Sequence, residues 1–265
     1  MSADPRGANY LVLRDHTVER RAQTHRFFEN LWVLSGEPTI HGQEVHFPGQ
    51  MGVDLEVSIL SPHAPRVAKD HWAWAGEVGG LGQFSEDQWG LHVTRAGSAE
   101  DFLTVLYPRA SGERAPRVSA LAGSAGARVA HSEGVDVLVL SPDQPAWVRD
   151  GGAELHGEMA LARRYDRGGL RLVVMARGAG AWTTSAALGE WGLESDGQVA
   201  LEITGGLVTG LSRGEPHSAV ITLPPRFGAA TTLVDGTPIA AVREGRTLTL
   251  ALPAGAHALS IRRVQ

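Results

Sequence analysis

Apolar and polar residues alternate in several short stretches of the chain, and this pattern limits what it can fold into. In residues 53–59, valine, leucine and isoleucine occupy every second position, and residues 199–203 and 248–252 repeat the pattern. Successive side chains of a strand point to opposite faces, so this alternation is typical of half-buried β-strands. The sequence therefore predicts antiparallel sheets with one packed face and one solvent-exposed face.

Continuous apolar runs and the lack of helical periodicity extend this prediction. Residues 102–107, 135–140 and 170–176 are apolar runs that indicate strands covered on both faces. Glycine-rich and aspartate-rich turn signals separate such runs. No stretch of about twelve residues carries a helical apolar stripe without a Gly or Pro break. We predict an all-β fold: a multi-stranded antiparallel β-sandwich, or two stacked sandwiches, with very little helix.

One compositional seam suggests how the chain divides. Residues 111–128 are rich in Gly, Ala, Ser and Arg. We predict a first β-sheet region at residues 1–110, a crossing or linker at 111–128, and a second β-sheet region at 129–265 that completes the sandwich. A long surface crossing between two sheet layers or two sandwiches is the first interpretation of the seam. A flexible interdomain linker is the second.

Charge and cysteine usage exclude several function classes. The 265 residues carry a net charge of −5 and include no cysteine. The negative balance argues against nucleic acid as a partner. The lack of cysteine excludes disulfides, thiolate nucleophiles and cysteine metal sites. No apolar run approaches membrane-spanning length, so we expect no membrane partner either.

Several segments, mostly in the first hundred residues, follow one another in a recognisable order. They are Asn-Tyr-Leu-Val-Leu-Arg-Asp at 9–15, His-Arg-Phe-Phe-Glu-Asn-Leu-Trp at 25–32, a strand pattern ending in Leu-Ser-Pro at 52–62, and paired strand patterns at 89–93 and 101–108. This order resembles the C-terminal β-sandwich region of heparinase II/III-like polysaccharide lyases. The resemblance implies a distal or accessory β-sandwich domain of a lyase that acts on uronate-containing glycans.

The family's catalytic elements have no counterpart in this chain. In full-length members an α-helical toroid supplies acid and base residues, and the sheet region begins with a His-x-His-x-Asp segment; neither is matched here. The catalytic residues are therefore unknown, and whether the chain is an enzyme is left open. We predict no cofactor and no metal. The alternative function is a stand-alone carbohydrate-binding β-sandwich module without lyase activity.

The resemblance also implies partners and a location. An anionic polysaccharide and an α-toroid lyase domain on another chain are the partners it implies. The opening residues lack the charged-then-apolar pattern of an export signal. We therefore expect an extracytoplasmic location only if the chain belongs to a secreted lyase.

Residues 69–74 are the most suggestive local feature for sugar binding. If they form a strand, Trp72 and Trp74 share one face, and His71 lies on the other. Two neighbouring indoles form a platform suited to the apolar face of a pyranose ring. We therefore predict that Trp72, Trp74 and His71 bind substrate. Packing of the two indoles in a core is the alternative interpretation, and it is the one the pattern favours.

Two further groups of residues are candidates for binding. Arg163 and Arg164 are suited to contact an anionic glycan, with a solvated hairpin as the favoured alternative. His41, Glu44 and His46 lie on a predicted tight hairpin and are residue types that bind zinc. We favour an exposed hairpin over a zinc site for these three residues.

Overall fold

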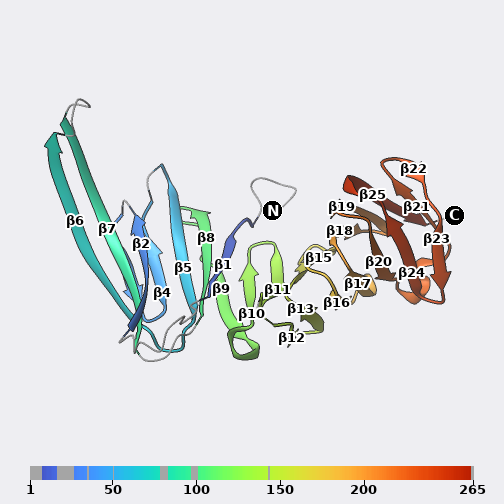
Figure 1. The fold of residues 1–265 in the computed structure, drawn as a ribbon, viewed down its shortest axis with the longest axis horizontal. Helices are drawn as coiled ribbons and strands as arrows, with labels where there is room; N and C mark the ends of the chain where they lie inside the picture. Colours follow the sequence, from blue (N-terminus) through green and yellow to red (C-terminus); the bar gives the residue numbers. More distant parts are fainter. Residues whose placement is uncertain are drawn as a thin grey trace. The chain divides into compact units, whose positions relative to one another are not determined.

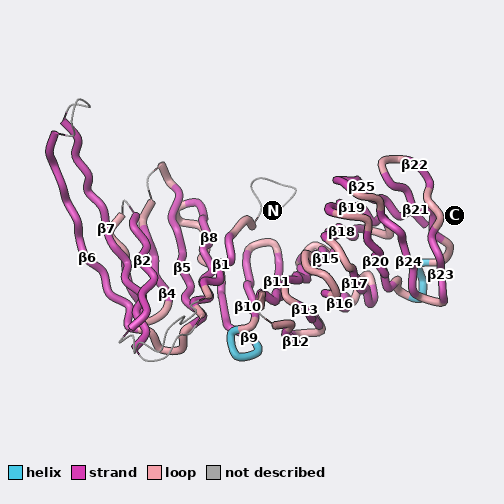
Figure 2. Tube along the Cα trace, viewed as in Figure 1, coloured by secondary structure: helices cyan, strands magenta, loops and turns pink. Residues whose placement is uncertain are grey.

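The protein is all-β, as the sequence predicts. The computed structural model describes residues 8–16, 27–34, 36–49, 51–77, 83–96, 101–142 and 144–263. It is 69% strand and 3% helix, arranged in four antiparallel sheets (Figures 1 and 2). Within the described residues, no helix is long and apolar enough to cross a membrane. The chain divides into two compact units, Met1–Val118 and Ser119–Gln265.

The first unit contains two sheets. One has five strands in the order β1 (Leu11–Asp15), β8 (Phe102–Ala110), β5 (Val53–Ser61), β4 (Glu44–Phe47) and β3 (Thr39–His41). The other has three strands in the order β2 (Phe27–Leu34), β7 (Gln83–Ala96) and β6 (Arg66–Glu77). β6 and β7 are the longest strands of this sheet, and they continue beyond the residues of β7 that β2 pairs with.

The core of the first unit lies between these two sheets. The alternation at residues 53–59 places Val57 and Ile59 on the inner face of β5, where both are almost completely buried. Leu91 and Val93 face them from β7. Phe102 begins β8 and belongs to the same apolar cluster. The strand predicted at 53–59 is therefore confirmed, with its apolar face inward.

The second unit contains a ten-stranded and a seven-stranded sheet. The ten-stranded order is β22 (Thr237–Pro238), β21 (Ala230–Val234), β25 (Gly255–Arg263), β19 (Leu207–Gly214), β18 (Gln198–Thr204), β15 (Leu170–Val174), β14 (Met159–Tyr165), β11 (Gly134–Leu140), β10 (Gly126–His131) and β9 (Arg117–Leu121). The seven-stranded order is β12 (Ala146–Asp150), β13 (Ala153–Gly157), β16 (Ala179–Ser185), β17 (Gly189–Ser195), β20 (His217–Thr222), β24 (Thr247–Leu252) and β23 (Ala241–Glu244). Successive hairpins of the chain belong alternately to the ten-stranded and the seven-stranded sheet, in the order β10–β11, β12–β13, β14–β15, β16–β17 and β18–β19.

Side chains from both of these sheets form the core of the second unit. Leu172 and Leu201 come from the ten-stranded sheet, and Leu155, Trp191 and Ile221 come from the seven-stranded sheet. All five are at most 1% exposed. Each unit therefore has its own hydrophobic core between two sheets, as in a two-layer sandwich.

Strand coverage departs from the sequence prediction in one place. The runs at 102–107 and 135–140 form β8 and β11, whose residues are mostly buried. The run at 170–176 forms β15, where buried and half-buried residues alternate instead. The prediction of coverage on both faces was wrong for β15. Arg171 interrupts this run, and its side chain lies on the outer face near Glu202.

The segment at residues 111–128 contains regular structure. β9, the short 3-10 turn η1 (Ala122–Ser124) and the start of β10 lie within it. The boundary between the two compact units, at Val118 and Ser119, also falls inside this segment. β9 pairs at the edge of the ten-stranded sheet, so the segment is partly built into that sheet.

Candidate functional site

Three aromatic side chains form a row on the outer face of the seven-stranded sheet. Trp147 on β12 is the cross-strand partner of His156 on β13, and their ring centroids are 4.8 Å apart with 21° between the planes. His156 is 5.2 Å from the ring of Trp182 on β16, with 17° between the planes. Near-parallel rings at such separations attract one another. We call Trp147, His156 and Trp182 the aromatic row.

The strand alternation explains why these rings lie outside. Val148, Leu155 and Ala181 occupy the intervening positions of the same strands and are completely buried in the core. The aromatic row must then lie on the opposite face. Trp147, at the end of the row, is 58% exposed. Aromatic surface gathered on an open sheet face is a feature of interaction sites.

Two glycines make room for Trp182. A Cβ atom at Gly180 would lie 2.7 Å from Cζ3 of Trp182 and 2.8 Å from Cε1 of His156. A Cβ atom at Gly192 would lie 2.5 Å from Nε1 of Trp182. All three separations are too short for real atoms, so the indole covers a surface that only glycine leaves open. Trp182 is thereby seated against two strands, and it holds His156 from one side.

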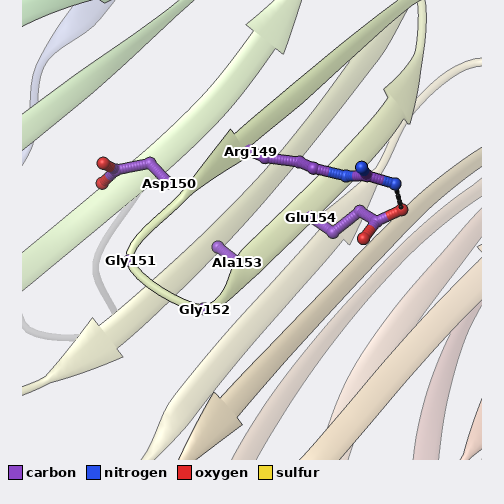
Figure 3. A pocket seen from close by; sticks show the side chains of 6 residues that line it. All are labelled: Arg149, Asp150, Gly151, Gly152, Ala153 and Glu154. Atoms are coloured by element: carbon purple, nitrogen blue, oxygen red, sulfur yellow. Dashed lines mark hydrogen bonds and ion pairs between the residues drawn. The ribbon is translucent and has the colours of Figure 1, made fainter.

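A charged pair borders the exposed end of the row. Arg149 follows Trp147 by two residues, and its guanidinium carbon is 5.8 Å from the centroid of the Trp147 ring. Its Nη2 donates a 2.8 Å hydrogen bond to Oε1 of Glu154 (Figure 3). This carboxylate raises the pKa of Arg149 above its usual value. The pair presents donors and acceptors beside an exposed indole.

The β12–β13 turn forms a shallow hollow next to this pair. Its lining residues are Arg149, Asp150, Gly151, Gly152, Ala153 and Glu154 (Figure 3). Gly151 and Gly152 have φ of 49° and 85°, as both central positions of a type I′ turn require. Asp150 points away from Arg149 and pairs with Arg128 at 3.1 Å.

The structure separates the two arginines that the sequence grouped together. Arg164 donates from Nη1 to the carbonyl oxygen of Gly151, so it holds the β12–β13 turn. Arg163 is only 5% exposed, and its Nε and Nη2 each lie 2.7 Å from the carboxylate oxygens of Asp136. Adjacent residues of a strand face opposite sides, so the two do not form one patch. These contacts favour a structural role for Arg163.

Asp136 shows how strongly Arg163 is held. Burial alone would raise the pKa of Asp136, but hydrogen bonds with His131 and Arg163 outweigh it and hold the pKa below its usual value. The His131 ring lies 3.2 Å from the same carboxylate. A buried arginine in such a pair is costly to release to a ligand.

In the first unit, Trp72 is a surface residue. It lies on β6, is 51% exposed, and has Gln88 as its cross-strand partner. The ring of His71 lies 4.7 Å from that of Trp89, with 31° between the planes, and it hydrogen-bonds Asp87 at 2.5 Å. The backbone of Trp74 belongs to β6, but its side chain lies outside the described part of the structure. The two predicted indoles therefore cannot be placed as a pair.

A row of three hydrogen-bonded polar side chains crosses the outer face of the same sheet near Trp72. His92 on β7 bonds Glu29 on β2 through Nδ1 at 2.8 Å, and its Nε2 lies 3.1 Å from Asp70 on β6. The bonds to Glu29 and Asp70 raise the pKa of His92. Gly90 lies beneath Asp70, where a Cβ atom would collide with the carboxylate. Both imidazole nitrogens are engaged, so this histidine links the three strands.

The predicted hairpin around His41 is confirmed, as strands β3 and β4 with His41 opposite Glu44. Ser58 donates a 2.5 Å hydrogen bond to Glu44, and burial raises the pKa of Glu44. His46 lies 3.0 Å from Glu56. Across the described residues, no group of three or more His, Asp or Glu side chains is arranged to hold a metal ion.

The aromatic row was missed by reasoning from sequence. The available signal was local. Trp147 and Arg149 are two residues apart before the Gly151-Gly152 turn, and Glu154 and His156 are two residues apart after it, so each pair shares one strand face. A two-residue hairpin turn places Trp147 opposite His156. Trp182 gives no such signal, because its neighbours are set by the pairing of β13 with β16.

Comparison of the chain with protein-family models and with curated proteins found no match. The resemblance to heparinase II/III-like lyases therefore rests on the sequence pattern alone.

Proposed function

We propose that this chain is a carbohydrate-binding β-sandwich protein, with the aromatic row as its sugar-binding surface. The observation that carries the proposal is the state of Trp147, which is 58% exposed and yet stacked on His156 with Arg149 and Glu154 at its edge. A pyranose ring has an apolar face and a rim of hydroxyl groups. An open indole suits the face, and a charged pair suits the rim.

The packing behind Trp147 supports this proposal energetically. Binding normally costs about 0.5–1.5 kcal/mol for each flexible side chain that becomes immobilised. His156 and Trp182 already restrict the indole, so little of this cost remains when a sugar binds. Rigid aromatic side chains are effective binding residues for this reason.

The resemblance adds a finer proposal about context. In it, the chain is the distal or accessory domain of a heparinase II/III-like lyase, and an α-toroid domain on another chain supplies the catalytic groups. The alternative is a stand-alone carbohydrate-binding module. Under either proposal the chain alone leaves uronate polymers intact. Unsaturated uronate absorbance at enzyme-like turnover would contradict both.

Titration calorimetry on the purified chain tests sugar binding directly. A glycan array first identifies oligosaccharides that bind, and the best of them is then titrated into wild type and into Trp147→Ala. We expect the substitution to abolish measurable binding while the thermal melt stays close to that of wild type. Unchanged binding in a folded Trp147→Ala variant would exclude the aromatic row as the site.

A further inference from the structure

We infer that the aromatic row selects uncharged glycan chains over polyuronates and sulfated glycans. This inference rests on the proposed sugar-binding function and names the class of sugar. It departs from the anionic polysaccharide that the resemblance implies. The charged groups on this face of the sheet carry the inference.

Two arginines near the aromatic row are engaged by carboxylates, whereas Arg164, at the adjoining β12–β13 turn, bonds a backbone carbonyl. Arg149 bonds Glu154 at 2.8 Å at the Trp147 end. Arg246 bonds Glu190 at 2.8 Å, and Glu190 lies on β17 two residues before Gly192, whose surface Trp182 covers. Each pair is neutral as a whole, so neither offers a net positive charge to an anionic sugar.

One carboxylate near the row has no such partner. Glu194 is exposed on β17, directly across from Gly180 on β16, and it has no ion-pair partner among the residues that the structure describes. Trp182 covers Gly180, so Glu194 lies beside the row. Arg149, Glu154 and Glu194 together carry a net charge of −1. An anionic sugar on the row would lie beside the like charges of Glu154 and Glu194, which disfavour it.

Hydroxyl groups suit the Arg149–Glu154 pair better than a carboxylate does. A hydroxyl can donate to Glu154 and at the same time accept from Arg149. A carboxylate or sulfate only accepts, so it can bond the other N–H groups of Arg149 but not Glu154, and it then lies next to a like charge. Glu154 therefore acts as the specificity-determining residue, and Arg149 is its partner.

Matched polymers test the inference. The probes are polygalacturonate and alginate, each compared with the same polymer after its carboxylates have been reduced to primary alcohols. We expect the reduced polymers to bind wild type at least about tenfold more tightly, with little dependence on salt. Tighter binding of the charged polymers would overturn the inference and leave the proposed function standing. No binding of any array glycan or of any of the four polymers, or binding that survives Trp147→Ala, would overturn the proposed function itself.

A charge-neutralising variant gives the second measurement. Glu154→Gln keeps the size of the side chain and releases Arg149 from its carboxylate, so we expect polygalacturonate affinity to rise about tenfold. Glu244→Gln is the matched control, because Glu244 is exposed at the far edge of the same sheet on β23. A thermal melt verifies that each variant is folded. No gain with Glu154→Gln, or an equal gain with Glu244→Gln, would contradict the assigned role of Glu154.

Discussion

Trp147 and Trp72 expose similar fractions of their side chains, 58% and 51%, on outer sheet faces of different units. They differ in what holds them. Trp147 is stacked on His156, which Trp182 supports in turn. Trp72 lies opposite Gln88, on a part of β6 and β7 that β2 does not reach. Exposure alone therefore does not distinguish a binding residue from a solvated one. Under the proposed function, the restriction of an exposed ring by its neighbours makes the difference.

A buried tryptophan sets the scale for this comparison. Trp191 is 1% exposed and contacts Phe227 edge-on at 5.2 Å. We expect Trp191→Ala to lower the free energy of unfolding by about 3–5 kcal/mol through lost burial and a cavity. Trp147→Ala and Trp72→Ala should each cost about 1 kcal/mol or less. Chemical denaturation measures all three. A loss at Trp72 as large as that at Trp191 would show that Trp72 is a core residue.

Sugar affinity should separate the two exposed tryptophans. We expect Trp147→Ala to weaken binding of the best array oligosaccharide by about thirtyfold or more, as for the central residue of an interface. Trp72→Ala should change it less than about twofold, because no comparable stack supports Trp72 among the side chains that the structure describes. Calorimetric titration of both variants gives the answer. If Trp72→Ala had the larger effect, the binding surface would lie in the first unit.

The support behind Trp147 can be disturbed without touching the ring. In Gly180→Ala, the new methyl group would collide with Trp182 and His156, so the row must shift. We expect sugar binding to weaken by about tenfold, with a modest loss of stability. Gly168→Ala serves as the control, because no atom lies within 4 Å of a Cβ there although φ is 80°. Unaltered affinity in Gly180→Ala would show that the stack is not needed for binding.

The smallest expected effect concerns pH in the first unit. The pKa of His92 in the folded protein is raised by Glu29 and Asp70. Its stabilising contribution is therefore complete below the unfolded value of about 6.5 and is lost as pH rises through the raised folded value. We expect His92→Gln to lower the melting temperature at pH 5.5 more than at pH 8.5. His63→Gln, at an exposed position, is the control. A difference that grew with pH would show that neutral His92 is the stabilising form.

The sequence was most informative where a single strand decides the outcome. The alternation at residues 53–59 identified the inner face of β5, because a strand's two faces follow from its own residues. The same rule places Arg163 and Arg164 on opposite faces of β14. Arg163 is buried because Asp136, 27 residues earlier, is its cross-strand partner. Period two alone cannot reveal such a partner.

The aromatic row could not be predicted in the same way. It depends on the register of β12 with β13 and of β13 with β16, and on glycines at positions 180 and 192. Register between strands distant in sequence is fixed by the packing of the whole sandwich.

The alternation of hairpins between the two sheets of the second unit has a consequence for how the chain assembles. β14 pairs with β11, and β18 pairs with β15. Each new hairpin of the ten-stranded sheet therefore pairs with the last strand of the previous hairpin in that sheet. Contacts from β10 to β19 thus link segments close in sequence, which favours rapid closure. A nascent chain leaving the ribosome can add one hairpin after another without waiting for its C-terminus. β25, which pairs with both β19 and β21, joins more distant parts at the end.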